Sequence, residues 1–396
     1  MIFYFIYAMI QTGKIINDPV HGFITIPQGL ILNLTQHFFF QRLRDIKQLG
    51  LTNLVYPGAT HTRLSHALGA MHLMNDAISS LVAKGVSVTD QERESSMAAI
   101  LLHDIGHGPF SHALEEKIVQ SFTHEELSLH IMEAMNVEFS GELSMAISIF
   151  KGEYHKNYLH QLVSSQLDVD RLDYLKRDSF FSGVAEGMIG LERIIKMMAV
   201  AGNDLVIEQK GIYSIEKFLI SRRLMYWQVY FHKTVLAAEQ LLVEIIIRAR
   251  ELVTNGFPLN GAPALLWFLN AQNSHSKETS IILEKFTSID DSDVLSAVKM
   301  WQTCGDIKLE KYSQMLVKRN LPKVLLANLP FSNDMSNDEK FISCGEVQNK
   351  GYDSVSEEIK ILTKQGTVHD IYDISDMLSA KAFSQITKKY FLCTSK

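Results

Sequence analysis

Cysteine, proline and long apolar runs are scarce in this chain, and each scarcity excludes a class of protein. The 396 residues contain only 3 cysteines and 8 prolines. Cys304, Cys344 and Cys393 are far apart and form no Cys-x-x-Cys pair. We therefore expect neither a disulfide framework nor a thiolate zinc site, and the cysteine usage is typical of a reducing compartment.

One apolar stretch stands at the start of the chain, in residues 1–10. It is shorter than the roughly 20 residues that cross a bilayer. It also lacks the basic start and the cleavage site of a secretory signal. We interpret residues 1–13 as an N-terminal extension, with Met9 as a possible true start of translation. No other run is long enough to span a membrane, so we expect a cytoplasmic protein without membrane association.

Positive charge is also in deficit, since the formal net charge is −6. A dedicated nucleic-acid binder is usually basic, so we do not expect a nucleic-acid partner. The hydrophobic fraction of 46% is sufficient to form a sizeable core.

Apolar positions recur mostly at helical spacing, which predicts a mainly α fold with minor β hairpins and a small mixed α/β C-terminal part. We expect helices at about 28–50, 63–84, 91–106, 124–136, 141–150, 158–178, 190–200, 215–253, within 264–327 and near 376–390. Short strands are expected at 14–26, a hairpin at 204–214 turning at Lys210-Gly211, and further strands after 338. Clusters of Gly and Pro at 255–263 and a polar stretch at 328–337 divide the chain into regions 14–254, 255–330 and 331–396.

The most informative segment is 101–112, Leu-Leu-His-Asp-Ile-Gly-His-Gly-Pro-Phe-Ser-His. His103 and Asp104 offer a metal one imidazole and one carboxylate from a single helix turn, and His107 follows one turn later. Glycines and a proline then end the helix, which lets a substrate approach the backbone. A second His-Asp pair at 369–370 has no histidine companions, and we expect no site there.

Two distant residues complete a possible metal site. His66 lies at the start of a predicted helix, and Asp170 lies in Asp-Val-Asp-Arg-Leu-Asp-Tyr at 168–174. Two imidazoles and two carboxylates form a mixed nitrogen and oxygen site, which suits a divalent Mn, Fe, Mg, Zn or Ni ion without choosing between them.

In this order, His66, His103-Asp104 and Asp170 resemble the H…HD…D signature of HD-domain metal-dependent phosphohydrolases. The stretches 40–50, 56–59, 103–112, 123–125 and 170–178 are similar to its deoxynucleoside triphosphate triphosphohydrolase branch. The resemblance covers roughly residues 15 to 240. It implies an HD-domain helical catalytic core at 14–254, whereas the helical accessory region at 255–330 and the C-terminal α+β region at 331–396 are predicted from the residue pattern alone. It also implies His66, His103, Asp104 and Asp170 as the metal ligands.

The resemblance assigns catalytic roles to His107, His124 and His112, with His112 facing phosphate. Hydrolysis of a phosphate ester needs an activated water, stabilisation of developing negative charge and a proton for the leaving oxygen. A histidine that titrates near neutral pH can supply that proton, and either His124 or His107 could do so. The neighbouring Glu125 could hold His124 in orientation.

The substrate contacts also follow from the resemblance. Arg63, Arg171 and Arg222, with Tyr174 beside them, would hold the phosphates, for which arginine is suited by its paired donors. Sugar and base contacts are implied for Gln48, Leu49, Asp178 and Tyr230. Asp178 would accept from the 3′-hydroxyl, and Tyr230 would crowd the 2′ carbon and reject ribose. Phe231 departs from the glutamine of a mammalian member of the branch.

We therefore expect a phosphohydrolase that converts a deoxynucleoside triphosphate into deoxynucleoside and triphosphate. Two alternatives stay open: another HD phosphohydrolase, such as a 5′-nucleotidase or a cyclic-nucleotide hydrolase, or a nucleotide sensor without turnover. Gln41 and Arg44 match a nucleotide effector site, whereas Gln36 replaces an aspartate that reads guanine there. The branch also implies a homo-oligomer, a dimer or a tetramer.

Overall fold

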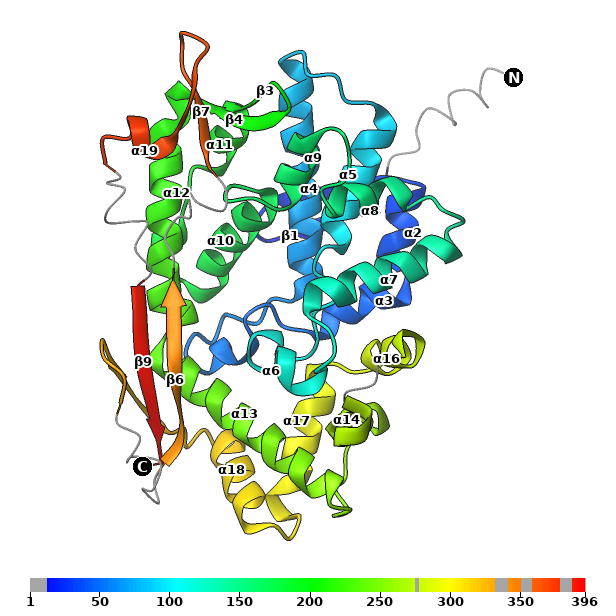
Figure 1. Ribbon diagram of the computed structural model, residues 1–396, viewed down its shortest axis with the longest axis vertical. Helices are drawn as coiled ribbons and strands as arrows, with labels where there is room; N and C mark the ends of the chain where they lie inside the picture. Colours follow the sequence, from blue (N-terminus) through cyan, green and yellow to red (C-terminus); the bar gives the residue numbers. More distant parts are fainter. Residues whose placement is uncertain (1–12, 275–277, 332–340, 350–357, 378–386, 396) are drawn as a thin grey trace.

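The computed structural model describes residues 13–274, 278–331, 341–349, 358–377 and 387–395, and helices dominate it (Figure 1). The α-helices are α2 (Leu30–Gln36), α3 (Phe38–Gln41), α4 (Arg63–Ala83), α5 (Asp90–Leu102), α6 (Ser111–Ile118), α7 (His124–Glu138), α8 (Ser144–Phe150), α9 (Asn157–Val163), α10 (Val169–Ser182), α11 (Leu191–Met197), α12 (Ile212–Met225), α13 (Lys233–Thr254), α14 (Pro263–Leu269), α15 (Ala271–Ser274), α16 (Thr279–Phe286), α17 (Asp291–Met300), α18 (Ile307–Val317) and α19 (Ile371–Ile374). Short 3₁₀ turns are η1 (Arg42–Asp45), η2 (Gly50–Leu54), η3 (Ala185–Gly187), η4 (Gln209–Gly211) and η6 (Trp301–Thr303), and η5 (Tyr226–Tyr230) is a π-helical turn.

Three small sheets accompany the helices. Antiparallel strands β1 (Lys14–Asp18) and β2 (Gly22–Ile26) form a hairpin. The second sheet has the order β3-β4-β7-β8, with β3 (Met198–Ala201), β4 (Asp204–Glu208), β7 (Lys360–Leu362) and β8 (Val368–Asp370). The third has the order β5-β9-β6, with β5 (Lys323–Ala327), β9 (Thr387–Thr394) and β6 (Phe341–Asn349), and it packs beside α13 (Figure 1). The mainly α architecture with minor β confirms the predicted fold class.

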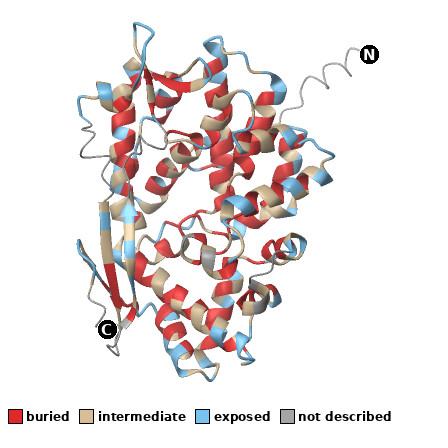
Figure 2. Ribbon diagram, viewed as in Figure 1, coloured by how far each residue is buried: buried red, intermediate tan, exposed pale blue. Residues whose placement is uncertain are grey.

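Helix α4 lies at the centre of the core and is buried on most of its faces (Figure 2). Thr62 caps its first turn, where the side chain accepts from the Ser65 amide. Helices α5 and α10 pack against α4 along its length. Gly69 permits this approach, because a Cβ atom there would lie 2.1 Å from an Asp173 carboxylate oxygen and 2.3 Å from Arg177 Nη2. The glycine thus brings the acidic face of α10 against α4.

The helices around the site begin at strong capping residues. Thr89 and Glu92 form a capping box at α5, and Thr123 and Glu126 form another at α7. Asp168 caps α10 by accepting from the Arg171 amide at 2.7 Å. These caps fix where each helix starts and therefore which of its residues face the site.

Several predicted elements are wrong in extent. The expected helix 28–50 is divided into α2, α3 and η1, because His37 takes an extended conformation and caps α3. The expected helix 158–178 breaks between α9 and α10 at the Asp168 cap, and the expected helix 215–253 is interrupted by η5. The hairpin lies at β3 and β4 and turns at residues 202–203, while Lys210-Gly211 lies in η4.

The C-terminal prediction is also partly wrong. Residues 387–390, expected in a final helix, belong to strand β9, and residues 378–386 lie outside the described residues. In the part of the chain that the structure describes, no helix combines the length and the apolar character needed to cross a membrane.

Candidate active site

Three helices bring the four predicted metal ligands together. His66 lies in the first turn of α4, His103 and Asp104 follow the last residue of α5, and Asp170 lies in the first turn of α10. Ligand atoms of His66, His103 and Asp170 all lie within 4.8 Å of one another. Asp104 Oδ1 is 3.2 Å from His103 Nε2, and Asp104 Oδ2 is 3.9 Å from His66 Nε2.

Each of the two imidazoles is oriented by a contact at its Nδ1 atom. His66 Nδ1 is 2.8 Å from Asp173 Oδ2, and His103 Nδ1 is 2.6 Å from the Ile100 carbonyl oxygen. Each ring therefore turns its Nε2 toward Asp170 Oδ1, at 3.0 Å for His66 and 3.4 Å for His103. These two buried nitrogens have no satisfactory hydrogen-bond partner in the described residues. Buried, unsatisfied imidazole nitrogens beside a carboxylate form a donor set that fits a divalent cation.

The electrostatics of the site also favour a cation. Burial alone would lower the pKa of His66, but contacts with Asp170 and Asp173 outweigh it and raise the pKa to about 10. The surrounding carboxylates thus stabilise positive charge at this position, where a metal ion would lie.

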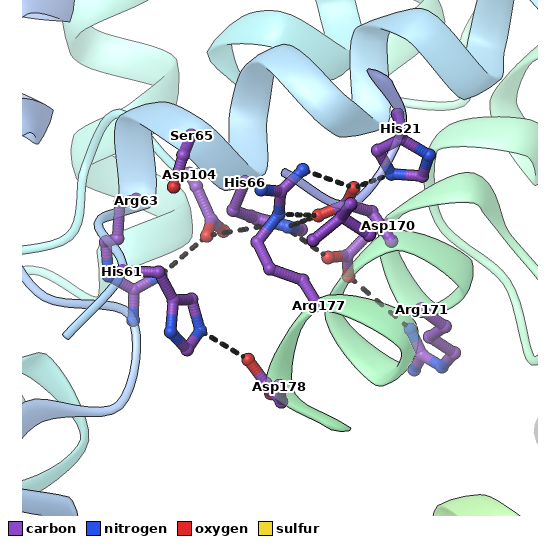
Figure 3. A network of polar contacts seen from close by, with 12 residues as sticks. His21, His61, Arg63, Ser65, His66, Asp104, Asp170, Arg171, Arg177 and Asp178 are labelled. Carbon is purple, nitrogen blue, oxygen red and sulfur yellow. Dashed lines mark hydrogen bonds and ion pairs between the residues drawn. The ribbon is translucent and has the colours of Figure 1, made fainter. Parts of the chain in front are cut away.

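A buried network holds the ligands in place (Figure 3). Asp173 receives hydrogen bonds from Arg177, with Nε at 2.8 Å and Nη2 at 3.0 Å, and lies 2.6 Å from His21 Nε2. Arg177 also donates to Asp18 at 2.7 Å. These contacts join the hairpin β1–β2 to α10 and fix the carboxylate that orients His66. Such outer partners typically set ligand orientation and metal affinity.

Arg63 lies beside the predicted metal ligands. It is 1% exposed and donates to Asp104 Oδ2 at 2.5 Å and to Ser111 Oγ at 2.7 Å. Arg171 on α10 donates to Asp168 Oδ2 at 2.8 Å and lies 3.9 Å from Asp170 Oδ2. Both arginines line the same cavity as Asp104 and Asp170.

The histidines predicted for catalysis form a stacked pair. The rings of His107 and His124 are 4.2 Å apart and nearly parallel. His107 Nε2 is 3.2 Å from Asp104 Oδ1, which places this pair next to the ligand set. The side chain of His112 lies outside the described residues.

Glu115, and not Glu125, orients His124. The Glu115 carboxylate on α6 contacts the His124 imidazole Nδ1 and also accepts from its backbone amide at 3.1 Å. Burial would lower the pKa of His124, but the contact with Glu115 outweighs it and raises the pKa. Burial and the charge on Arg63 lower the pKa of His107 to about 3. Near neutral pH, His124 is therefore the better proton donor of the two.

A cavity of about 680 Å³ opens over these residues. Its lining includes the predicted residues Gln48, Leu49, Arg63, Asp104, His107, His124, Asp170, Arg171, Tyr174, Asp178 and Tyr230. Arg222 is not among the lining residues and instead donates to Gln166 Oε1 at 3.2 Å. The cavity volume is typical of a small-molecule site.

Asp178 already has partners in this structure. Its Oδ1 is 2.7 Å from His61 Nε2, and its Oδ2 accepts from the Tyr230 hydroxyl at 2.6 Å. Asp178, which we expect to accept from a sugar hydroxyl, thus also accepts from Tyr230 and orients its ring. His61 is buried and stacks on Phe181, with ring centroids 4.6 Å apart.

Sequence reasoning missed four residues that lie near the cavity or near the predicted metal ligands: His61, Glu115, Asp173 and Glu239. Glu115 lies on α6, shortly after the His-Asp motif, and His61 lies five residues before His66, so proximity in sequence was a weak signal for both. Asp173 lies three residues after Asp170 on α10, which was a weak signal of the same kind, whereas Glu239 on α13 is far from every motif in the sequence.

Comparison with known proteins agrees with this geometry. The HD domain family matches residues 63–178, and the HD associated region matches residues 189–254. A crystal structure of a phosphohydrolase from Bacteroides thetaiotaomicron superposes with a TM-score of 0.92 at 49% identity, covering 97% of this chain and 100% of that one. The chain belongs to the HD-domain phosphohydrolases.

Two sequence relatives extend the comparison. The uncharacterised Bacillus subtilis protein YwfO is 33% identical over 315 residues, covering 78% of this chain and 71% of the relative. A Dictyostelium discoideum protein, described as a deoxynucleoside triphosphate triphosphohydrolase SAMHD1 homolog, is 29% identical over 262 residues, covering 61% of this chain and 51% of that protein. This HD-domain chain thus spans about half the length of the Dictyostelium relative. HD domains bind divalent metals, and the His/Asp set described above is where this chain could hold one.

Proposed function

We propose that this HD-domain phosphohydrolase hydrolyses deoxynucleoside triphosphates to deoxynucleoside and triphosphate. The observation that carries the proposal is the composition of the single cavity described above. It joins Asp104 and Asp170 of the predicted ligand set and two arginines to a hydrogen-bonded Asp178–Tyr230 pair, which supports recognition of a sugar. The similarity to the Dictyostelium protein supports the same substrate class.

The divalent metal would be held by His66, His103, Asp104 and Asp170. When bound, it supplies Lewis acidity that lowers the pKa of water and neutralises charge on a phosphoryl oxygen. Arg63 and Arg171 bind the phosphates. In doing so each guanidinium shares donors between its present carboxylate partner, Asp104 or Asp168, and the substrate oxygens.

His124 protonates the leaving 5′-oxygen in this proposal. Its pKa is raised by Glu115, so more of it carries the proton near neutral pH than of an unperturbed histidine. The stacked His107 is neutral there and positions His124 by ring contact. Of the two histidines that the sequence leaves open as proton donors, the structural evidence supports His124.

Tyr230 provides the sugar discrimination. Its hydroxyl donates to Asp178, which is fixed from the other side by His61, so the phenol ring is held rigidly in the cavity wall. A rigid ring against the 2′ carbon leaves room for hydrogen and not for a hydroxyl. Deoxynucleotides are thus the preferred substrates.

The test is a panel of nucleoside mono-, di- and triphosphates, both ribo and deoxyribo, assayed with added divalent metal and with products separated by chromatography. We expect triphosphate and deoxynucleoside as the initial products, and much slower turnover of ribonucleotides. The Asp170→Ala variant should lose bound metal and turnover while retaining helical content. Orthophosphate as the sole initial phosphate product, or equal rates on dGTP and GTP, would contradict the proposal.

A further inference from the structure

A buried carboxylate of the accessory region joins two chain segments that belong to the catalytic core. Asp291 is the first residue of α17 and is 4% exposed. Its Oδ1 accepts from the backbone amide of Phe110 at 2.9 Å, and its Oδ2 accepts from the backbone amide of Lys47 at 3.0 Å. One side chain therefore satisfies two backbone donors that are far apart in the sequence.

The first of these segments forms part of the cavity wall. Lys47 directly precedes Gln48 and Leu49, which both line the cavity. Lys47 also forms an isolated β-bridge with Thr62, whose side chain caps α4. The hydrogen bond to Asp291 therefore fixes this wall close to the start of α4, the helix that carries the first predicted metal ligand.

The second segment leads into the helix that orients the proton donor. Phe110 is the N-cap of α6, and its backbone is left-handed, with a φ of 47°. A residue with a Cβ atom rarely adopts this conformation, which persists only where the surrounding structure holds it. The hydrogen bond to Asp291 holds it at the point where α6 begins. One turn later α6 carries Glu115, so the placement of α6 determines the orientation of His124.

The accessory region makes a second contact with the same loop. Arg42 Nη2 donates to the carbonyl oxygens of Ile105 and His107 at 2.8 and 2.9 Å, and the guanidinium lies 4.7 Å from the ring centroid of Phe286 on α16. Gly108 permits this approach, because a Cβ atom there would lie 3.0 Å from the Phe286 ring. Helices α16 and α17 thus both pack on the loop between α5 and α6.

We propose that Asp291 is a positioning residue, through which the accessory region holds the cavity wall at 47–49 and the start of α6 in the arrangement that the reaction needs. Burial raises the pKa of Asp291 to about 6, against the two amide donors and the charges on Lys47 and Arg63. The carboxylate form therefore predominates at neutral pH, and both oxygens accept. The inference rests on the proposed function for its turnover measurement, whereas the two hydrogen bonds do not depend on the substrate.

The experiment compares wild type, Asp291→Ala and Asp291→Asn by steady-state turnover of deoxynucleotides and by amide hydrogen exchange. We expect Asp291→Ala to lower kcat by about ten- to a hundredfold, because α6 and the proton donor shift relative to the bound substrate. The change in KM should be much smaller, since the phosphate-binding arginines stay on α4 and α10. Asp291→Asn keeps the shape and one acceptor, so its kcat should lie between the other two. Exchange in Asp291→Ala should become faster at residues 45–50 and 108–115.

Asp306→Ala is the matched control within the accessory region. Asp306 caps α18 and pairs with Arg248 at 2.6 Å, and its hydrogen bonds to described residues go to α13 and α18. Both alanine variants should lower Tm, but only Asp291→Ala should lower kcat at a temperature well below either Tm. Unchanged kcat in Asp291→Ala, or an equal loss of kcat in Asp306→Ala, would overturn the positioning role.

Failure of the proposed function would look different, because wild type would then release no triphosphate from any deoxynucleotide. In that case hydrogen exchange still tests Asp291. Faster exchange at both segments in Asp291→Ala, with wild-type exchange there in Asp306→Ala, would support Asp291 as the link between them. Wild-type exchange at either segment in Asp291→Ala would refute it.

Discussion

At the scale of single residues, the pair Glu115–His124 determines how the enzyme should respond to pH. The Glu115 carboxylate, which accepts a hydrogen bond from His124 Nδ1, raises the pKa of His124 against the effect of burial. A general acid works in its protonated form, so kcat falls as pH rises through that raised pKa. Removing the negative charge on Glu115 lowers the pKa of His124 and moves this fall to lower pH.

The Glu115→Gln variant tests this directly. We expect kcat of this variant to fall, on the basic side of its pH profile, at a lower pH than kcat of wild type. More of its activity should therefore remain in mild acid than at neutral pH. Glu125 is next to His124 and raises its pKa less than Glu115 does, so Glu125→Gln is the control and should shift the profile less than Glu115→Gln. Identical profiles in Glu115→Gln and wild type would exclude Glu115 as the group that tunes His124.

Residue-level reasoning from the sequence is strongest where the candidate ligands are neighbours in the chain. The adjacent His103-Asp104 and the matching His66 and Asp170 were identifiable from motif and order. Glu125 was chosen as the partner of His124 because it is adjacent, yet consecutive helical side chains diverge by about 100°. The true partner, Glu115, lies on another helix, and its position shortly after the His-Asp motif does not by itself indicate that contact.

At the scale of elements, the packing of α10 on α4 contributes both to the stability of the fold and to the orientation of His66 in the candidate metal site. Arg177, which is fully buried, binds Asp173 and Asp18, and Asp173 in turn orients His66. Removing one member of a buried ion-pair network leaves its partners uncompensated. Such a loss typically costs about 3–5 kcal/mol.

We therefore expect Arg177→Met to lower the free energy of unfolding by about 3–5 kcal/mol. Metal affinity should fall as well, because Asp173 would no longer be fixed behind His66. Denaturant unfolding and metal content after dialysis measure the two effects. Lys176→Met, one residue earlier on the same helix and without an ion pair to described residues, is the control. Wild-type stability and metal retention in Arg177→Met would show that the network is dispensable.

Helical periodicity predicted the existence of α4, α5, α7 and α10 but not the interruptions. The π-helical turn η5 divides the expected helix 215–253 where Tyr226 and Tyr230 face the cavity. Such turns are frequent at functional sites because they re-aim side chains at a small cost in local regularity. The aromatic run 226–231 is compatible with a continuous helix, so only tertiary packing decides the break.

At the scale of the whole molecule, the C-terminal sheet contributes to a site that the sequence located in the first part of the chain. Val347 on β6 lines the cavity, and Lys389 on β9 lies 4.9 Å from the ring centroid of Trp227 in η5. The sequence after residue 255 carries no recognised motif, so its part in the cavity could not be predicted. Long-range strand pairing and docking on α13 bring it there.

This arrangement predicts that a substitution at Val347 weakens substrate binding and leaves the chemical step unchanged. Replacing it by Tyr fills part of the cavity from the side of the sheet, away from the helices that carry His124 and the metal set. We expect KM for deoxynucleotides to rise about tenfold with little change in kcat, because filling the cavity weakens binding of the ground state and transition state alike. Glu346→Tyr is the matched control, since side chains alternate along a strand and Glu346 is exposed and paired with Lys388 at 2.5 Å. A fall in kcat at unchanged KM in Val347→Tyr would mean that the sheet acts on the reacting groups and not on substrate binding.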